Sequence, residues 1–271
     1  PPFYSRCKNL KIHQIPAASD NLIWLIEYEP GFVAAVDGPS AKEVLIYCRQ
    51  HALELTTIIN THTHGDHIGI NRDLQRKGML SKIRVVGSKS RRDQIPGITE
   101  GVEDGDQVQL GSACGTVFLT EGHIDGHVSY LFSDVLFCGD TLFTGGCGYL
   151  FDGPPSKMYH SLQRLASLPD HTKVCCAHEY TIDNLRFAIS VEPQNTMLQE
   201  RYHQTVSICQ NGGSVVPSTM LDERQTNPFI RTESAELQEN LQRFYPDLQT
   251  DDPVAVFTRC REHKNRKLYR R

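Results

Sequence analysis

The stretch THTHGDH, residues 61–67, places three histidines and one aspartate within seven positions. Histidine and aspartate are ligands that zinc, manganese and iron accept, and a loop at the end of a strand can aim several of them at one point. His62 and His64 stand two positions apart and can share one metal, whereas Asp66 and His67 can lean toward a second. The spacing differs from the HExxH of metalloproteases, in which one helix face carries both histidines. The stretch therefore predicts metal ligands in a loop.

Three later stretches present histidine or aspartate in the same kind of place. Each follows an apolar, strand-like run and stands beside Gly, Thr or Ala. GHIDGH offers His123 and His127, FCGDT offers Asp140, and CCAHEYT offers His178. Packing alone does not explain four strand ends of this kind, and we interpret them as one metal constellation.

The elements that would carry these residues are short strands and helices. In the first half, β-branched and aromatic runs are broken by Pro-Gly and Asp-Gly turns, and Ser40 is placed to cap a helix. The predicted strands cover 10–15, 21–28, 31–37, 56–61 and 83–87, and predicted helices follow Ser40 and cover 70–78. From Asp104 onward short strands recur. Two β-rich halves flanked by helices favour two sheets packed face to face with helices outside.

After about residue 181 the sequence pattern changes from short strands to helices. Four segments there have helical patterns: 183–191, 195–211, 234–244 and 252–264. We therefore predict a metal domain over residues 1–180 and a smaller all-helical, substrate-binding domain over residues 181–271.

Composition narrows the class of protein. A net charge of −4 over 271 residues gives no reason to expect nucleic-acid or membrane partners, and no apolar run is long enough to span a bilayer. Nine scattered cysteines without a CxxC pair favour a reducing compartment, so we expect a cytoplasmic protein. A monomer is a separate expectation. Because the chain begins Pro-Pro, removal of a mitochondrial transit segment stays open.

Four motifs together resemble a known family. THTHGDH is similar to the THxHxDH signature of the metallo-β-lactamase superfamily, and GHIDGH, CGDT and AHEYT follow in the order that superfamily has. HEYT and PSTMLDERQTNPFIR resemble the glyoxalase II (hydroxyacylglutathione hydrolase) branch, and the similarity runs from about residue 10 to 267. The resemblance implies an α/β (α+β) fold, an αββα sandwich with a smaller helical C-terminal domain.

The resemblance also implies a ligand set for two divalent ions, with zinc as the first expectation and iron or manganese as alternatives. One ion would be bound by His62, His64 and His123, the other by Asp66, His67 and His178, and Asp140 would bridge them. His127 matches a position that does not bind metal, and we interpret it as a core histidine that orients its neighbours.

The implied reaction is hydrolysis of S-D-lactoylglutathione to D-lactate and glutathione, in methylglyoxal detoxification. A hydroxide held between the two metals would attack the thioester carbonyl. A thiolate, with a parent pKa of about 8.5, leaves without a strong general acid. The expected catalytic residues are Asp140 and Asp66, and we hypothesise that Asp66 also holds the hydroxide by a hydrogen bond.

The glutathione part would lie between the two domains. Tyr180 matches the family tyrosine, and Arg261 and Lys264 match a basic pair that would meet the glycine carboxylate. The alternative for this pair is a solvated basic tail, because residues 259–271 hold seven Lys or Arg and one acid. Tyr149 stands where the family usually has Lys or Arg, and Phe151 where some members have Tyr.

Three alternative functions stay open beside the glutathione thioester. Trypanothione carries fewer carboxylates than glutathione and extra positive charge, so a missing cation at Tyr149 would suit a trypanothione thioester. A persulfide dioxygenase with a single iron uses a related motif but lacks the long helical domain. A non-catalytic binding homologue would be expected to have lost a ligand, and none of the seven is missing.

Overall fold

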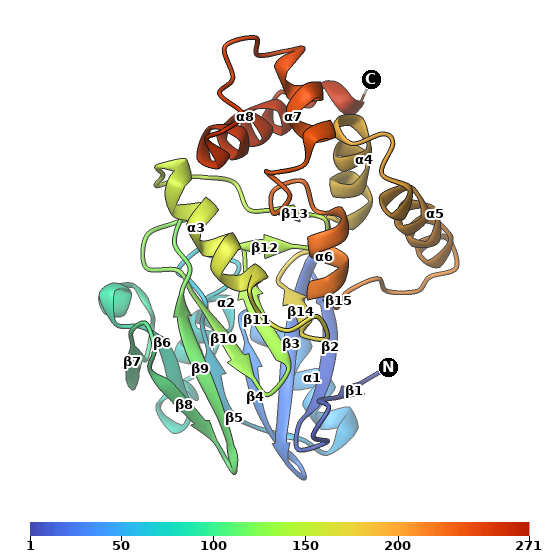
Figure 1. Cartoon of the computed structure of the whole chain (residues 1–271). Helices are drawn as coiled ribbons and strands as arrows, with labels where there is room; N and C mark the ends of the chain where they lie inside the picture. The colour runs from blue at the N-terminus through green and yellow to red at the C-terminus, as the bar shows by residue number, and fades with distance from the viewer. Residues whose placement is uncertain (271) are drawn as a thin grey trace.

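The strands form two large sheets that face each other (Figure 1). The computed structural model describes residues 1–270. The first sheet has the order β1-β2-β3-β4-β5-β6-β7. Its strands are β1 (Phe3–Tyr4), β2 (Lys11–Ala17), β3 (Asn21–Glu29), β4 (Phe32–Val36), β5 (Glu54–Ile59), β6 (Arg84–Ser88) and β7 (Glu100–Val102). The first four strands are antiparallel neighbours, and β4 to β7 run parallel to one another.

The second sheet has the order β15-β14-β11-β10-β9-β8. Its strands are β8 (Gln107–Leu110), β9 (Ala113–Leu119), β10 (Val128–Phe132), β11 (Val135–Gly139), β14 (Lys173–Cys176) and β15 (Ser218–Thr219). A separate hairpin, β12 (Leu142–Phe143) with β13 (Gly146–Cys147), lies between the sheets and the C-terminal helices in Figure 1.

Helices cover both outer faces. The first sheet carries α1 (Ala41–His51), α2 (Gly69–Arg76) and the short 3₁₀ helices η1 (Leu80–Lys82) and η2 (Lys89–Gln94), and the second carries α3 (Pro155–Ala166). The Ser40 side chain caps α1 by accepting the Lys42 N–H, and Val44 and Cys48 on its buried face join the core of the first sheet. The helix α3 was not among the predicted elements.

The space between the sheets is the main hydrophobic core. Trp24 on β3 packs edge-on against Phe137 on β11, with 6.5 Å between ring centroids. The indole N–H of Trp24 donates to the Cys176 carbonyl of β14 at 2.9 Å. One side chain therefore fixes the two sheets to each other by both packing and a hydrogen bond.

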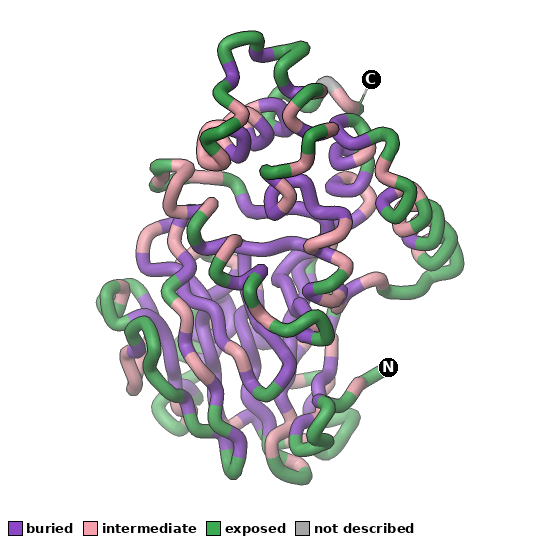
Figure 2. Tube along the Cα trace, in the orientation of Figure 1, coloured by how far each residue is buried: buried purple, intermediate pink, exposed green. Residues whose placement is uncertain are grey.

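The C-terminal helices extend this core. They are α4 (Thr181–Val191), α5 (Thr196–Gln210), α6 (Met220–Thr226), α7 (Ala235–Gln242), α8 (Pro253–Asn265) and the 3₁₀ helix η3 (Leu268–Arg270). Phe187, Phe229 and Phe257 belong to the same buried cluster as the sheets. Figure 2 shows that α5 is largely exposed, and only Leu198 and Thr205 are buried on it.

The two segments on either side of residue 180 also share a strand pairing. The strand β15, from the C-terminal segment, adds to the edge of the second sheet by pairing with β14. The division into 1–180 and 181–271 stays a prediction, and Arg271 at its end lies outside the described residues. Within residues 1–270, no helix has both the length and the apolar character needed to cross a membrane.

Candidate metal centre

The ends of several strands meet at one place. The loop after β5 carries His62 to His67, and the segments after β9, β11 and β14 bring His123, Asp140 and His178 to it. Within the first loop the His64 carbonyl accepts the N–H groups of His67 and Ile68, at 3.0 and 3.2 Å. This tight turn lets neighbouring residues face two directions, and α2 begins directly after it at Gly69.

A first group of donor atoms gathers around His64. Its Nδ1 lies 3.1 Å from His62 Nε2 and 3.0 Å from His123 Nε2. The Oδ2 atom of Asp140 lies 3.4 Å from His123 Nε2. Three ring nitrogens and one carboxylate oxygen are thus within reach of a single small cation.

A second group gathers beside the first. The Oδ2 atom of Asp66 lies 3.6 Å from His67 Nε2 and 3.3 Å from His178 Nε2. The other oxygen of Asp140, Oδ1, lies 3.4 and 3.5 Å from the same two nitrogens. Asp140 therefore presents one oxygen to each group.

Hydrogen bonds on the far sides of the rings set the tautomers of two histidines. Thr61 Oγ1 donates to Asp37 Oδ2 at 2.6 Å, so its oxygen accepts from His62 Nδ1 at 3.0 Å. The Tyr149 carbonyl, which can only accept, lies 2.7 Å from His123 Nδ1. With the proton on Nδ1, each neutral ring turns a bare Nε2 lone pair toward the cluster.

Two aspartates accept hydrogen bonds from the Nδ1 atoms of the two histidines in the second group. Asp37 Oδ2 lies 2.9 Å from His67 Nδ1, and Asp20 Oδ1 lies 2.8 Å from His178 Nδ1. The sequence reasoning missed both residues. Asp37 follows an apolar strand and precedes a glycine, which is the signal that singled out Asp140, so it could have been found. Asn21 is a further missed contact, and its Nδ2 donates to Asp66 Oδ2 at 3.0 Å.

The pKa shifts of the residues in the cluster indicate that it favours added positive charge. Burial lowers the pKa of His62 and His123, which keeps these rings neutral. Burial alone would also lower the pKa of His67, but Asp140 and Asp37 together raise it to about 9. The close contact with His178 holds the pKa of Asp66 well below its usual range, so this carboxylate is ionised.

Two buried atoms at the centre of the cluster have no hydrogen-bond partner. They are His67 Nε2 and Asp140 Oδ1, which face each other across 3.4 Å. A buried ring nitrogen and a buried carboxylate oxygen that face each other without a hydrogen bond are costly unless a cation lies between them. The donor set and these two atoms fit divalent metal ions.

The structure places His127 beside this cluster with its nitrogens already engaged. Its Nε2 accepts the backbone N–H of Asp140 at 3.2 Å, and its Nδ1 faces the hydroxyls of Thr120 and Thr141 at 3.0 and 3.2 Å. The ring also stacks on His62, with 4.8 Å between centroids. His127 thus contacts the main chain of Asp140 and offers no free lone pair to a metal.

Exposed aromatic side chains border the cluster. Phe151 lies edge-on to His64 and His123, each at 5.2 Å between centroids, and Tyr149 contacts Phe151 at 4.9 Å. Tyr149 is 52% exposed and Phe151 61% exposed. These side chains are open to a bound molecule rather than part of the core.

Arg261 and Lys264 lie on the buried face of α8. Arg261 Nη1 donates to the Cys147 carbonyl at 3.0 Å, and its Nε and Nη2 donate to Asn265 Oδ1. Lys264 donates to Asn184 Oδ1, and both residues are under 10% exposed. The alternative of a solvated basic tail is therefore wrong for this pair.

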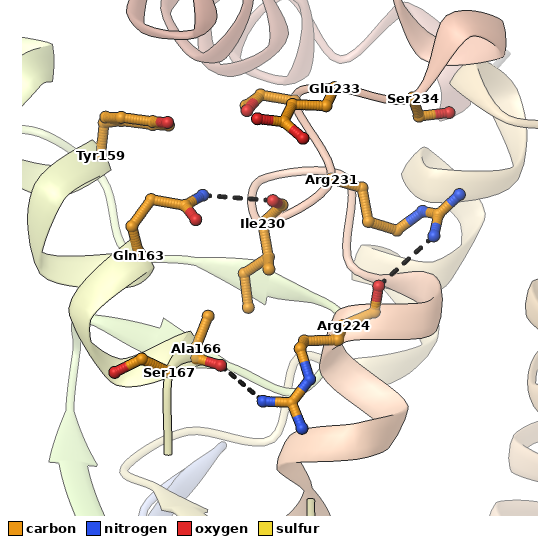
Figure 3. Close-up of a pocket in the computed structure, with 10 residues that line it drawn as sticks. Tyr159, Gln163, Ala166, Ser167, Arg224, Ile230, Arg231, Glu233 and Ser234 are labelled. Carbon is orange, nitrogen blue, oxygen red and sulfur yellow. Dashed lines mark hydrogen bonds between the residues drawn. The ribbon is translucent and has the colours of Figure 1, made fainter. Parts of the chain in front are cut away.

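A separate cavity of about 440 Å³ lies away from the histidines (Figure 3). Residues of α3, α6 and the loop after α6 line it, including Gln163, Arg224 and Arg231. Both arginines are already engaged: Arg224 donates to the Ala166 and Leu168 carbonyls, and Arg231 forms an ion pair with Glu192 at 2.9 Å. Among the described residues that line this cavity there is no pair of free cations and no metal-binding cluster.

Comparisons with known proteins agree with this geometry. Residues 30–178 match the family described as the metallo-β-lactamase superfamily, and residues 179–267 match the hydroxyacylglutathione hydrolase C-terminus. A protein from Synechococcus sp. named hydroxyacylglutathione hydrolase is 43% identical over 265 residues, which cover 94% of this chain and 99% of that protein. The chain belongs to the hydroxyacylglutathione hydrolase family. A family member from Aliivibrio salmonicida is likewise 43% identical, over 256 residues and the same shares of both chains.

Solved structures support the fold of this hydroxyacylglutathione hydrolase family member. The B3 metallo-β-lactamase BLEG-1 has a TM-score of 0.61 at 21% identity and covers 81% of this chain, with 99% of its own. ETHE1 from Myxococcus xanthus has a TM-score of 0.59 at 24% identity, over 92% and 98% of the two chains. The predicted metallo-β-lactamase sandwich is confirmed, and the chain is an enzyme of the hydrolase class.

Proposed function

We propose that this chain hydrolyses S-D-lactoylglutathione, or a closely related S-2-hydroxyacylglutathione, to the 2-hydroxy acid and glutathione. The reaction would serve methylglyoxal detoxification. One observation carries the proposal: in a member of the hydroxyacylglutathione hydrolase family, two groups of bare donor atoms share the single carboxylate of Asp140. A cytoplasmic, monomeric enzyme with a metal domain over 1–180 and a substrate-binding domain over 181–271 belongs to the same proposal.

Seven residues would hold two divalent ions, with zinc as the first candidate and iron or manganese as alternatives. His62, His64 and His123 would hold one ion, and Asp66, His67 and His178 the other, with one Asp140 oxygen for each. Such ions supply an activated water near neutral pH and a Lewis acid for the thioester carbonyl.

Asp66 would have a second task in the reaction. Its side chain is 41% exposed, whereas the other carboxylate of the centre, Asp140, is 10% exposed. Because Asp66 stays ionised, it can accept a hydrogen bond from the attacking water and hold the water's lone pair toward the carbonyl carbon. The leaving thiolate needs no strong acid, since its parent thiol has a pKa of about 8.5.

Arg261 and Lys264 would receive the glycine carboxylate of the glutathione part. Three donor nitrogens of Arg261 are engaged, and Nη1 also contacts Cys147 Sγ, but a guanidinium has five N–H groups, so one N–H on Nη2 is left for a carboxylate. The Tyr180 hydroxyl, and the rings of Tyr149 and Phe151, would contact the rest of the thiol carrier.

The alternatives are less well supported. The C-terminal match over residues 179–267 and the names of the curated relatives favour the glutathione thioester over a persulfide. All seven donor residues are present, which argues against a non-catalytic homologue. A trypanothione thioester has one observation in its favour, the absence of a cation at Tyr149.

The test uses purified protein whose metal content has been determined. Turnover of S-D-lactoylglutathione would be measured beside turnover of the corresponding trypanothione thioester. We expect higher kcat/KM on the glutathione ester. Higher kcat/KM on the trypanothione ester would change the carrier, and no turnover of either ester with two metals bound would overturn the proposal.

A further inference from the structure

The β12–β13 hairpin connects two parts of the metal centre. Asp140 precedes it with only Thr141 between, and Tyr149 follows it with only Gly148 between. Gly148 packs so closely that a Cβ atom there would lie 1.9 Å from the Asp140 carbonyl oxygen. Because the Tyr149 carbonyl accepts from His123 Nδ1, the hairpin sets the position of one ligand and the ring orientation of another.

The hairpin is too short to hold its own shape. Only two residue pairs join its strands, Leu142 with Cys147 and Phe143 with Gly146. An isolated two-stranded hairpin is at best marginally stable in water. Its remaining backbone groups need partners from elsewhere in the chain.

Side chains of α6 and its C-terminal end supply some of these partners, whereas Arg261 and Asn184 donate to the Cys147 and Thr144 carbonyls. Asn227 Nδ2 lies 3.0 Å from the Gly146 carbonyl oxygen and 3.4 Å from that of Phe143. Glu223 Oε2 accepts the Gly145 N–H at 2.8 Å and Asn227 Nδ2 at 2.9 Å. Both side chains are fully buried, so water cannot replace these bonds.

Glu223 is itself fixed in place. Its Oε1 accepts from Arg201 Nη2 at 2.6 Å and from Ser218 Oγ at 2.7 Å. The buried carboxylate therefore has a charged partner on α5 and hydrogen bonds on both oxygens. Glu223 and Asn227 belong to the stretch PSTMLDERQTNPFIR, to which neither metal binding nor substrate binding assigns a task.

We propose that Asn227, anchored by Glu223, is a positioning residue of the metal centre. With one N–H directed to Glu223, it holds the hairpin at Gly146 with the other, and through Gly148 and Tyr149 it fixes the direction of the His123 lone pair. The inference rests on the metal centre of the proposed function, but it needs no particular substrate. It assigns the C-terminal segment a role in metal binding.

The test is a metal titration with a matched control. Metal-free wild type, Asn227→Ala and Leu237→Ala would be titrated with Zn²⁺ against a chromogenic chelator, well below their melting temperatures. Leu237 is fully buried on α7 and its side chain has no polar atom, so the control destabilises the helices without removing a hydrogen bond to the hairpin. We expect Asn227→Ala to weaken one of the two Zn²⁺ equivalents about 10- to 100-fold, and Leu237→Ala to leave both unchanged.

A milder variant covers the case in which Asn227→Ala does not fold. Glu223→Gln keeps the shape of the side chain but turns one acceptor into a donor, so either the contacts with Gly145 and Asn227 or the contact with Arg201 is lost. We expect a smaller loss of affinity, at least about threefold, for the same equivalent. Unchanged Zn²⁺ affinity in the folded variants would overturn the inference. Because no thioester is used, that result is separate from a failure of the proposed hydrolysis.

Discussion

The rings of His178 and Tyr180 lie parallel, with 2° between their planes and 5.1 Å between their centroids. Both residues also donate to the same atom, Asp20 Oδ1, at 2.8 and 3.3 Å. Burial and the charge of Asp20 raise the pKa of Tyr180, which keeps its hydroxyl protonated as a donor. A proposed metal ligand and a proposed substrate contact thus depend on one carboxylate.

The Asp20→Asn substitution removes that shared charge. The amide can still accept from His178, but it polarises the ring less, so we expect metal affinity in the second group to fall about tenfold. Tyr180→Phe is the control, because it keeps the stacked ring and loses only the hydroxyl. We expect it to retain metal and to raise KM. The prediction is wrong if Asp20→Asn binds Zn²⁺ as tightly as wild type in a chelator competition.

Asp66→Asn tests the hydrogen bond to the attacking water. The amide oxygen can still face the second group, but the charge that orients the water is lost. For protein in which two bound metals per chain have been verified, we expect kcat to fall about 100-fold with little change in KM. Stopped-time assays with metal analysis of the same samples would measure this. Full turnover with both metals retained would remove the second role of Asp66.

Tyr149→Lys tests which thiol carrier the enzyme prefers. An added cation beside the exposed aromatic residues would attract glutathione, which carries more carboxylate than trypanothione. We expect kcat/KM for the glutathione ester to rise about tenfold, near 1.4 kcal/mol, and that for the trypanothione ester to fall. Tyr149→Gln removes the ring without adding charge, and it should raise kcat/KM for neither ester. Equal changes on both esters for the two variants would mean that charge at this position does not select the carrier.

The lowered pKa of Lys264 predicts that substrate binding depends on pH. Burial, together with the charge of Arg261, lowers the pKa of Lys264 to about 7. The ammonium needed to bind a carboxylate is therefore present below pH 7 and lost above it, so KM should rise between pH 7 and pH 9. In Lys264→Arg the charge persists, and we expect KM to stay flat over the same range. A KM that rises equally in both proteins would show that another group titrates.

The lowered pKa of Lys264 also means that its buried ammonium group destabilises the folded chain at low pH. Between pH 7 and about pH 10, the unfolded chain holds a proton on this lysine that the folded chain does not, so the free energy of unfolding contributed by Lys264 increases with pH. We expect Lys264→Met to be more stable than wild type at pH 6, and the difference to shrink toward pH 10. Urea unfolding at several pH values measures it. A less stable Lys264→Met at pH 6 would contradict the expected burial cost.

The sequence was most informative about side chains that directly follow an apolar strand. His62, His123, Asp140 and His178 each follow such a run, and the structure brings them together. Asp37 carries the same signal, but its contact with Thr61 depends on the parallel register that aligns Val36 with Ile59. Register between strands is set by tertiary packing, which one sequence does not reveal.

Other features were harder to predict for similar reasons. Asp20 lies in a turn between β2 and β3 and reaches His178 only because Asn21 bridges to the end of β14. The helix α3 has buried residues at Met158, Leu162 and Leu165, a readable helical spacing that follows a Pro-Pro pair usually typical of a loop. The burial of Arg261 could not be foreseen, because a cluster of cations on a terminal helix usually faces solvent.

The positions of the ligands along the chain also constrain how the protein is made. His62 and His64 leave the ribosome more than one hundred residues before His178, and Asn227 follows later still. A nascent chain therefore exposes a partial set of metal-binding side chains before the strand β14 can pair with β11. The proposed donor set is therefore complete in a growing chain only once His178 has been made, and the Asn227 contact with the hairpin can form only later.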